Sequence, residues 1–124
     1  MIVLITRDVF FASKITGTAA LLGLKTVTVS GSDQVAEVVT GSEISGLILD
    51  LGSGVSPEQA MQSLPVESRE RTIAFGAHVD TEALAAAAQA GFHTVLPRSR
   101  FSAELPQLLR GLSESDGRAS VPDA

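Results

Sequence analysis

Gly46-Leu47-Ile48-Leu49-Asp50-Leu51 is a short apolar run with a carboxylate near its end. A strand that helices cover on both faces of a parallel sheet is apolar throughout, so this run predicts a central strand of such a sheet. Burying the Asp50 carboxylate alone would be unfavourable, so we expect it to reach solvent or to lie beside a cation. A simpler interpretation is a loop cap, in which Asp50 accepts the backbone N–H groups of Gly52 and Ser53.

Short apolar runs and helix-spaced segments alternate along the whole chain. We expect strands at residues 2–6, 25–29, 46–51, 71–75 and 94–96. We expect five helices between and after these strands. The first carries Phe11 to Leu22, the second lies between Ser32 and Gly41, and the third and fourth span residues 57–64 and 82–90. The fifth runs from Ser102 to Leu112. Ser56-Pro57-Glu58-Gln59 has the composition of a capped helix start, and Gly23 and Gly91 are expected to end helices.

Strict alternation of strands and helices predicts a parallel sheet with right-handed crossovers and helices on both faces. The expected fold is α/β: a three-layer, doubly wound, five-stranded parallel sheet of order 2-1-3-4-5, flavodoxin-like. We expect this domain to occupy residues 1–112. Residues 113–124 are small and polar, which is typical of a flexible C-terminal tail.

The composition excludes several classes of function. The chain has 124 residues, with 14 acidic and 9 basic side chains and a formal net charge of −5. Cysteine is absent, which excludes a disulfide scaffold, a thiol nucleophile and a Cys-based zinc site. The acidic balance and the lack of Trp and Tyr argue against nucleic-acid binding. No stretch is long and apolar enough for a membrane helix or a signal peptide, so we expect a cytoplasmic domain without membrane contact.

The carboxyl ends of the strands define the candidate site. In the order 2-1-3-4-5 the topological switch lies between the first and third strands, where doubly wound domains bind their ligands. The residues expected at this edge are Thr6, Arg7, Asp8, Asp50, Gly52, Gly76, His78 and Arg98. His78, and also His93, are expected to be surface loop residues, because neither has a partner at metal-ligand spacing.

The order of elements, with an aspartate ending the third strand, resembles the receiver domain of two-component response regulators. The resemblance covers Met1 to about Leu112. Its most detailed part is Ala86-Ala87-Ala88-Gln89-Ala90-Gly91, followed by a short strand and by Arg98, because receivers have a basic residue seven positions after that glycine. The resemblance implies that Asp50 stands where receivers accept a phosphoryl group from a histidine kinase.

The metal ligands of receivers are replaced in this sequence. Receivers have an acidic pair after the first strand that helps to hold Mg²⁺, and here those positions are Thr6 and Arg7. Asp8 follows directly after the two positions of this acidic pair, and it also suits the N-cap of the first helix. Asp8 and Asp50 are therefore only weak metal candidates, and we expect no cofactor. We predict instead that Arg7 forms an ion pair with Asp50 in place of the metal.

Other functional positions of receivers also differ. The Ser/Thr after the fourth strand corresponds to Gly76, and the aromatic position of the fifth strand corresponds to Val95. Arg98 corresponds to the receiver lysine, with Pro97 before it, although a shift of one or two residues would place Leu96 there instead.

Two surfaces are candidates for partner contact. The alanine-rich fourth helix leaves a smooth stripe, and receivers commonly dimerise through the fourth helix, fifth strand and fifth helix; alternatively, alanine there simply favours the helix. The residues predicted at this homodimer interface are Ala83, Ala87, Ala90, Arg98 and Arg100. In the first helix only one of Phe10 and Phe11 can face the sheet, and the exposed one is a further contact candidate.

The sequence therefore predicts a degenerate receiver-like signalling domain. We expect it to act by protein–protein contact, with a histidine kinase or an output protein as partner, without Mg²⁺-dependent phosphorylation and without enzymatic activity. One alternative is a working receiver that is phosphorylated on Asp50. Another is a small-anion or nucleotide sensor that uses Arg7 and Arg98.

Overall fold

Five parallel strands form one sheet in the order β2-β1-β3-β4-β5, as the sequence predicts. The computed structural model describes residues 1–41 and 43–114, and of Ser32, residues 39–41 and Glu114 only the backbone. The strands are β1 (Ile2–Ile5), β2 (Thr26–Val29), β3 (Gly46–Asp50), β4 (Thr72–Gly76) and β5 (Thr94–Pro97). Because the carboxyl ends of parallel strands share one edge, this order brings the segments after β1 and β3 together at the switch point.

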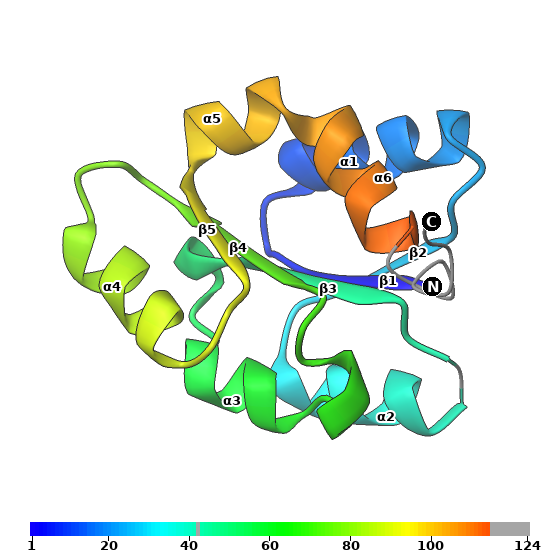
Figure 1. Cartoon of the computed structure of the whole chain (residues 1–124), viewed down its shortest axis with the longest axis horizontal. Coiled ribbons are helices and arrows are strands. Elements are labelled where there is room, and N and C mark those ends of the chain that lie inside the picture. The colour runs from blue at the N-terminus through cyan, green and yellow to red at the C-terminus, as the bar shows by residue number, and fades with distance from the viewer. Residues whose placement is uncertain (42, 115–124) are drawn as a thin grey trace, which may run out of the picture.

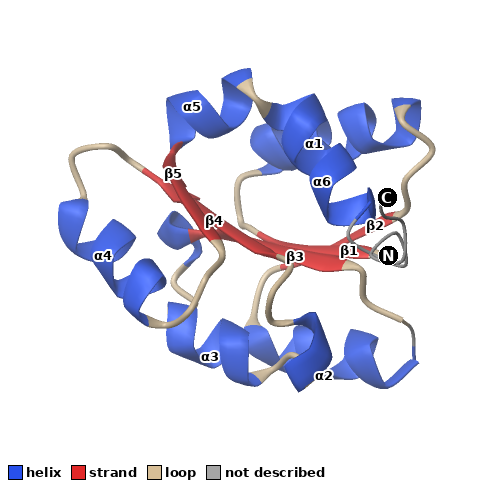
Figure 2. Cartoon of the chain, viewed as in Figure 1, coloured by secondary structure: helices blue, strands red, loops and turns tan. Residues whose placement is uncertain are grey.

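Helices cover both faces of the sheet (Figures 1 and 2). One face carries α1 (Val9–Leu21), α5 (Arg98–Ala103) and α6 (Leu105–Glu114). The other face carries α2 (Ser32–Gly41), α3 (Pro57–Gln62) and α4 (Thr81–Gln89), with the short 3₁₀ turns η1 (Leu51–Ser53) and η2 (Val66–Ser68) in the connections. In the described part of the chain, no helix has the length and apolar character that crossing a membrane requires.

The central strands separate two apolar cores because successive side chains of a strand point to opposite faces. Leu47 and Leu49 of β3 pack toward α2 and α3, whereas Ile48 packs toward α1 and α6. All three are fully buried. The two-sided burial explains why the run around Leu47-Ile48-Leu49 is continuously apolar, and it leaves Asp50 at the strand end as the first polar side chain.

Local capping follows the sequence closely. Ser56 Oγ accepts the amide of Gln59 at 3.1 Å, and Gln59 Oε1 accepts the amide of Ser56 at 3.2 Å, so the predicted capping box starts α3. Gly23 and Gly91 follow α1 and α4 with φ angles of +77° and +101°, which favour glycine. These caps fix where α1, α3 and α4 begin or end.

The last part of the domain differs from the prediction. Instead of one helix from Ser102, α5 begins at Arg98 directly after β5, and a break at Glu104 separates it from α6. Pro97 is responsible for the early start, because its φ of −62° and extended ψ of 151° suit the residue before a first helical turn. The helix α6 continues through Glu114, two residues past the predicted boundary at 112. Residues 115–124, most of the predicted tail, lie outside the described residues.

Candidate functional site

Thr6 and Asp50 meet at the switch point between β1 and β3. Ile5 is in register with Leu49, so the next residues of the two strands are neighbours. The Thr6 hydroxyl donates a hydrogen bond of 2.7 Å to Oδ2 of Asp50. Both residues are 3% exposed, so the carboxylate is buried beside a hydroxyl and not beside a second acid.

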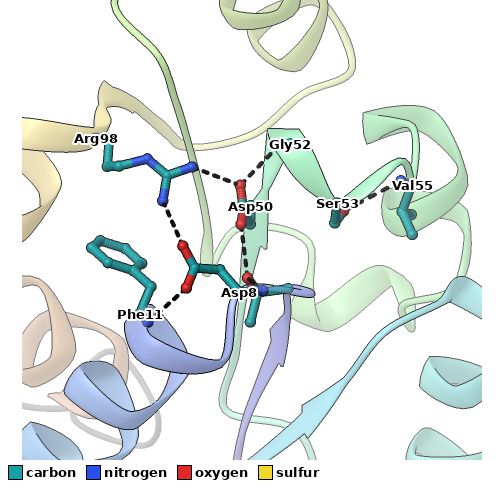
Figure 3. A network of polar contacts seen from close by, with 8 residues as sticks. Asp8, Phe11, Asp50, Gly52, Ser53, Val55 and Arg98 are labelled. Atoms are coloured by element: carbon teal, nitrogen blue, oxygen red, sulfur yellow. Dashed lines mark hydrogen bonds and ion pairs between the residues drawn. The ribbon is translucent and has the colours of Figure 1, made fainter.

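The second oxygen of Asp50 accepts two donors. The amide of Gly52 donates to Oδ1 at 2.9 Å, which confirms the predicted loop cap. Nη2 of Arg98 lies 3.4 Å from the same oxygen. Among the described hydrogen bonds none runs from the Ser53 amide to Asp50, so this part of the prediction is wrong; the Ser53 hydroxyl accepts the amide of Val55 at 3.3 Å (Figure 3). Asp50 is therefore both a loop cap and one member of an ion pair.

Arg98 joins Asp50 to a second carboxylate (Figure 3). Its Nη1 lies 3.7 Å from Oδ2 of Asp8. Asp8 is also the N-cap of α1, because its Oδ1 accepts the amide of Phe11 at 3.1 Å. The Asp8 amide in turn donates to the Thr6 hydroxyl at 3.1 Å. Thr6, Asp8, Asp50 and Arg98 thus form one continuous polar network.

Aromatic rings hold the Arg98 guanidinium from the apolar side. Its central carbon lies 5.0 Å from the ring centroid of Phe11 and 5.2 Å from that of Phe75. Phe75 is stacked on Phe101 at 4.4 Å, and Phe11 lies 5.0 Å from Phe75. A guanidinium on a ring face is stabilised electrostatically, and its weaker hydration suits a half-buried position. The aromatic support and the two carboxylates together fix Arg98 at the edge of the sheet.

The predicted ion pair between Arg7 and Asp50 is wrong. Arg98 is the partner of Asp50, and within the described residues Arg7 forms no ion pair. Thr6 places its side chain on Asp50, and the chain then turns into the α1 cap at Asp8. Arg7 is consequently exposed and lines a groove of about 430 Å³ beside β2.

The two glycines at the site are close to neighbouring side chains. A Cβ atom on Gly52 would lie 3.3 Å from Oδ1 of Asp50 and 3.9 Å from Nη2 of Arg98. A Cβ atom on Gly76 would lie 3.1 Å from Cδ1 and 3.2 Å from Cβ of Leu51. The side chain of Leu51 therefore fills the space beside the position where receivers carry a hydroxyl. His78 and His93 are both exposed loop residues, as predicted.

The residues present do not fit a magnesium ion of the receiver type. Mg²⁺ requires near-octahedral oxygen ligands, usually including carboxylates. The two carboxylates at this edge, Asp8 and Asp50, both face the Arg98 guanidinium, which occupies the space that a metal ion would need. In residues 1–41 and 43–114 there is no group of three or more His, Cys, Asp or Glu side chains able to hold a metal.

The predicted α4 interface is only partly exposed. Ala87 is fully buried in the core below the sheet, so its assignment to an interface is wrong. Ala83 and Ala90 are half-buried, and Arg98 faces the site. Arg100 forms an exposed pair of 2.8 Å with Glu104, and this hydrogen bond, with the charge of Glu104, raises the pKa of Arg100. The homodimer through this face stays a prediction.

Comparisons with known proteins define the fold class. Neither a protein-family model nor a curated protein matches the sequence. Solved structures do match. The receiver domain of the sensor histidine kinase PA1611 from Pseudomonas aeruginosa PAO1, with a magnesium ion in its active-site cleft, has 19% identity and a TM-score of 0.73, over 90% of this chain and 94% of that chain.

Two further structures extend the likeness. The receiver domain of NtrX from Brucella abortus has 14% identity and a TM-score of 0.77, over 93% of this chain and 99% of that chain. The phosphorylated cyanobacterial phytochrome response regulator RcpA has 16% identity and a TM-score of 0.70, over 98% of this chain and 97% of that chain. The chain therefore has the fold of response regulator receiver domains, as its sequence predicts.

The sequence alone did not predict the aromatic part of the site. Phe11, Phe75 and Phe101 come from α1, β4 and α5, and each fits an ordinary core position in its own element. Only the convergence of Phe11 and Phe75 on Arg98, with Phe101 stacked on Phe75, gives them a role at the site. The sequence did offer one signal for aromatic residues near the site. Phe11 stands three residues after the Asp8 cap and Phe75 one residue before Gly76, and both Asp8 and Gly76 were expected at this edge of the sheet.

Proposed function

We propose that this protein is a receiver-like signalling domain that acts by protein–protein contact and not by Mg²⁺-dependent phosphorylation of Asp50. The observation that carries the proposal is the position of Arg98 between Asp8 and Asp50. The partner is a signalling protein, such as a histidine kinase or an output protein. We expect no catalytic activity of the domain itself.

The charge balance at the site supports this proposal. Phosphoryl transfer depends on cations that neutralise the developing negative charge, and on a nucleophilic oxygen free to meet the donor. Here a fixed guanidinium neutralises Asp50, and the carboxylate has already accepted the Thr6 hydroxyl and the Gly52 amide. Its side chain is 4% exposed, so a phosphoryl donor would have to displace these contacts.

The space around the carboxylate supports the proposal as well. Gly76 carries no hydroxyl to contact a transferred phosphoryl group, and the Leu51 side chain lies against it. At Thr6, Asp50 and Gly76 the groups that would bind metal or phosphoryl are thus replaced or occupied by internal contacts of the protein, whereas Arg7 is exposed. Internal contacts of this kind favour one fixed conformation of the site, which suits a domain recognised by its surface.

The decisive experiment is a phosphorylation assay on the full chain. The protein is incubated with Mg²⁺ and acetyl phosphate, or with beryllofluoride, and followed by intact mass and by NMR of its amides; a working receiver is the positive control. We expect no adduct and no change at residues 6–8 or at Asp50. An adduct that disappears in Asp50→Asn would overturn the proposal and establish a working receiver.

A thermal-shift screen tests the sensor alternative with the same protein. Phosphate, carboxylates and nucleotides are added singly, and we expect no ligand to raise the melting temperature of the wild type. A rise that is abolished in Arg7→Ala or Arg98→Ala would replace our proposal by a ligand-sensing function.

A further inference from the structure

The outer edge of β2 carries backbone hydrogen-bonding groups without a partner. β2 lies at one side of the sheet, with β1 as its neighbour (Figure 2). The carbonyls of Lys25 and Val29 accept amides from β1 and the residue after it, so alternate residues of β2 turn their backbone groups toward β1. Thr26 and Thr28 turn theirs outward, where no described residue forms a hydrogen bond with them. The next outward amide, that of Ser30, donates to Oε1 of Gln34 at 2.8 Å, so the free edge ends there.

Apart from its shortness, this edge lacks the features that protect edge strands. Natural edge strands carry charged residues, proline or bulges that discourage a further strand. Residues 26–29 are uncharged and β-branched throughout, and they stay in unbroken register with residues 2–5. The other edge strand, β5, ends in Pro97, which has no N–H to offer a neighbour. Of the two edges of the sheet, β2 is therefore the one suited to accept another strand.

A groove of about 430 Å³ lies along this edge. Thr28 and Ser30 line it on the side of β2, and Ala12 and Thr16 line it on the side of α1. Successive side chains of a strand point to opposite faces, so every second side chain of a strand added beside β2 would point toward this groove. The groove thus offers space for apolar side chains of the added strand.

Unpaired cations lie at both ends of the free edge. Lys25 directly precedes β2 and is exposed. Arg7 is exposed as well, and it lines the groove near the carboxyl end of the strand. Neither forms an ion pair in the described part of the chain, and the acid of the groove, Asp8, is already paired with Arg98. These charges favour a bound segment with acidic residues at its ends.

We propose that the edge of β2 binds an extended segment of the signalling partner as a sixth strand of the sheet. Main-chain hydrogen bonds to Thr26 and Thr28 would supply affinity, and alternate apolar side chains in the groove, with acidic ends near Lys25 and Arg7, would supply specificity. The proposal rests on the proposed function, because it names the surface through which the protein contacts its partner. The β2 edge of a second copy is a poorer occupant, since it would bring short threonines to the groove and the same cations to the contact.

The test uses a short synthetic peptide in which valine and threonine alternate between terminal glutamates. Two further forms are N-methylated, one on the odd amides and the other on the even amides. Each peptide is titrated into the ¹⁵N-labelled full chain and followed by NMR. We expect the unmethylated peptide to shift the amides of residues 25–30 and to slow hydrogen exchange at Thr26 and Thr28. One methylated form should bind about tenfold more weakly and the other nearly as well, because only alternate amides of an added strand face β2.

Matched variants at one position locate the contact. Thr28→Pro removes an outward N–H and leaves the pairing with β1 in place, and it should weaken the peptide about tenfold or more. Thr28→Glu keeps the N–H but brings a like charge to the groove, and it should weaken the peptide as well. Thr28→Val is the control, because it retains the backbone groups and the shape of the side chain, and it should leave the affinity unchanged. Circular dichroism establishes that each variant is folded.

Three results would overturn the proposal. The first is equal binding of the two methylated peptides, or no binding of the unmethylated one. The second is a set of shifts on β5 or on the exposed side of α1 without shifts at Thr26 and Thr28. The third is a concentration-dependent dimer, seen by sedimentation without peptide, whose contact maps to β2, since the occupant would then be a second copy. None of these readouts involves phosphorylation of Asp50, so a failure here is distinguishable from a failure of the proposed function.

Discussion

Nη2 of Arg98 lies 3.4 Å from Oδ1 of Asp50, across the edge where β3 and the start of α5 meet. The guanidinium comes from the first residue of a helix, and its direction is set by Pro97 before it and by the rings of Phe11 and Phe75 beneath it. A cation built into the chain thus stands beside the residue that receivers phosphorylate. We therefore expect the stability of the protein to depend on this ion pair and on the residues around it.

Arg98→Met should destabilise the protein by about 1–2 kcal/mol, because the buried Asp50 carboxylate loses its cation. A larger loss is not expected, since Arg98 is itself 36% exposed and water screens the pair. Urea unfolding of the full chain measures the change. Arg100→Met is the control, because it breaks an exposed pair with Glu104 and should have little effect. Equal losses in the two variants would contradict the interpretation of the site.

The same interaction can be isolated by a double-mutant cycle. Asp50→Asn removes the charge while keeping the size of the side chain. The loss caused by Arg98→Met should be smaller in the Asp50→Asn background than in the wild type, because no buried charge is then left unpaired. Additive effects would show that Arg98 stabilises the fold through its contacts with Asp8 and the rings and not through Asp50.

Thr6→Val should destabilise the protein by about 1–3 kcal/mol, because it leaves a buried carboxylate oxygen and the Asp8 amide without the Thr6 hydroxyl. Thr6→Ser retains the hydroxyl and should recover most of this loss. The measurement is the urea midpoint of the three proteins. If serine lost more stability than valine, the volume of the side chain would matter more than the 2.7 Å hydrogen bond.

The positions of the strands could be predicted because burial leaves a direct pattern in the sequence, whereas their order was expected from the alternation of strands and helices, for which 2-1-3-4-5 is a common arrangement. Each strand covered on both faces is a continuous apolar run, and Leu47-Ile48-Leu49 shows this plainly. The place of Asp50 follows from the same pattern, since it is the first polar residue after the run. The Ser56 capping box was also predictable, because its two hydrogen bonds join residues only three positions apart.

The partner of Asp50 was not predictable in the same way. Arg7 and Arg98 both follow strands whose ends lie near Asp50, and the sequence does not tell which way either side chain turns. Thr6 takes the contact to Asp50 in the β1 connection, whereas the first turn of α5 directs Arg98 inward. The direction of the Ala87 side chain was not predictable either. A helix made almost wholly of alanine has little amphipathic pattern, so packing alone selects the alanine that faces the core.

Phe101→Ala should destabilise the protein by about 3–5 kcal/mol, because Phe101 is fully buried and stacked on Phe75. Phe10→Ala removes the same atoms from a side chain that is 89% exposed, and we expect a change within about 0.5 kcal/mol. Thermal unfolding of the two variants checks the contrast. A large loss in Phe10→Ala would mean that this ring is covered in solution, which would favour self-association through α1.

Gly76→Ser would restore the hydroxyl that receivers carry after the fourth strand, but this chain has no room for it. The new Cβ would lie 3.1 Å from Cδ1 and 3.2 Å from Cβ of Leu51, so the Leu51 side chain must move. We expect a loss of about 1–3 kcal/mol, which is typical of added atoms in a packed region. Leu51→Ala opens the space, so Gly76→Ser should cost clearly less in that background than in the wild type. Urea unfolding of the four proteins gives the coupling, and full additivity would show that Leu51 does not restrict this position.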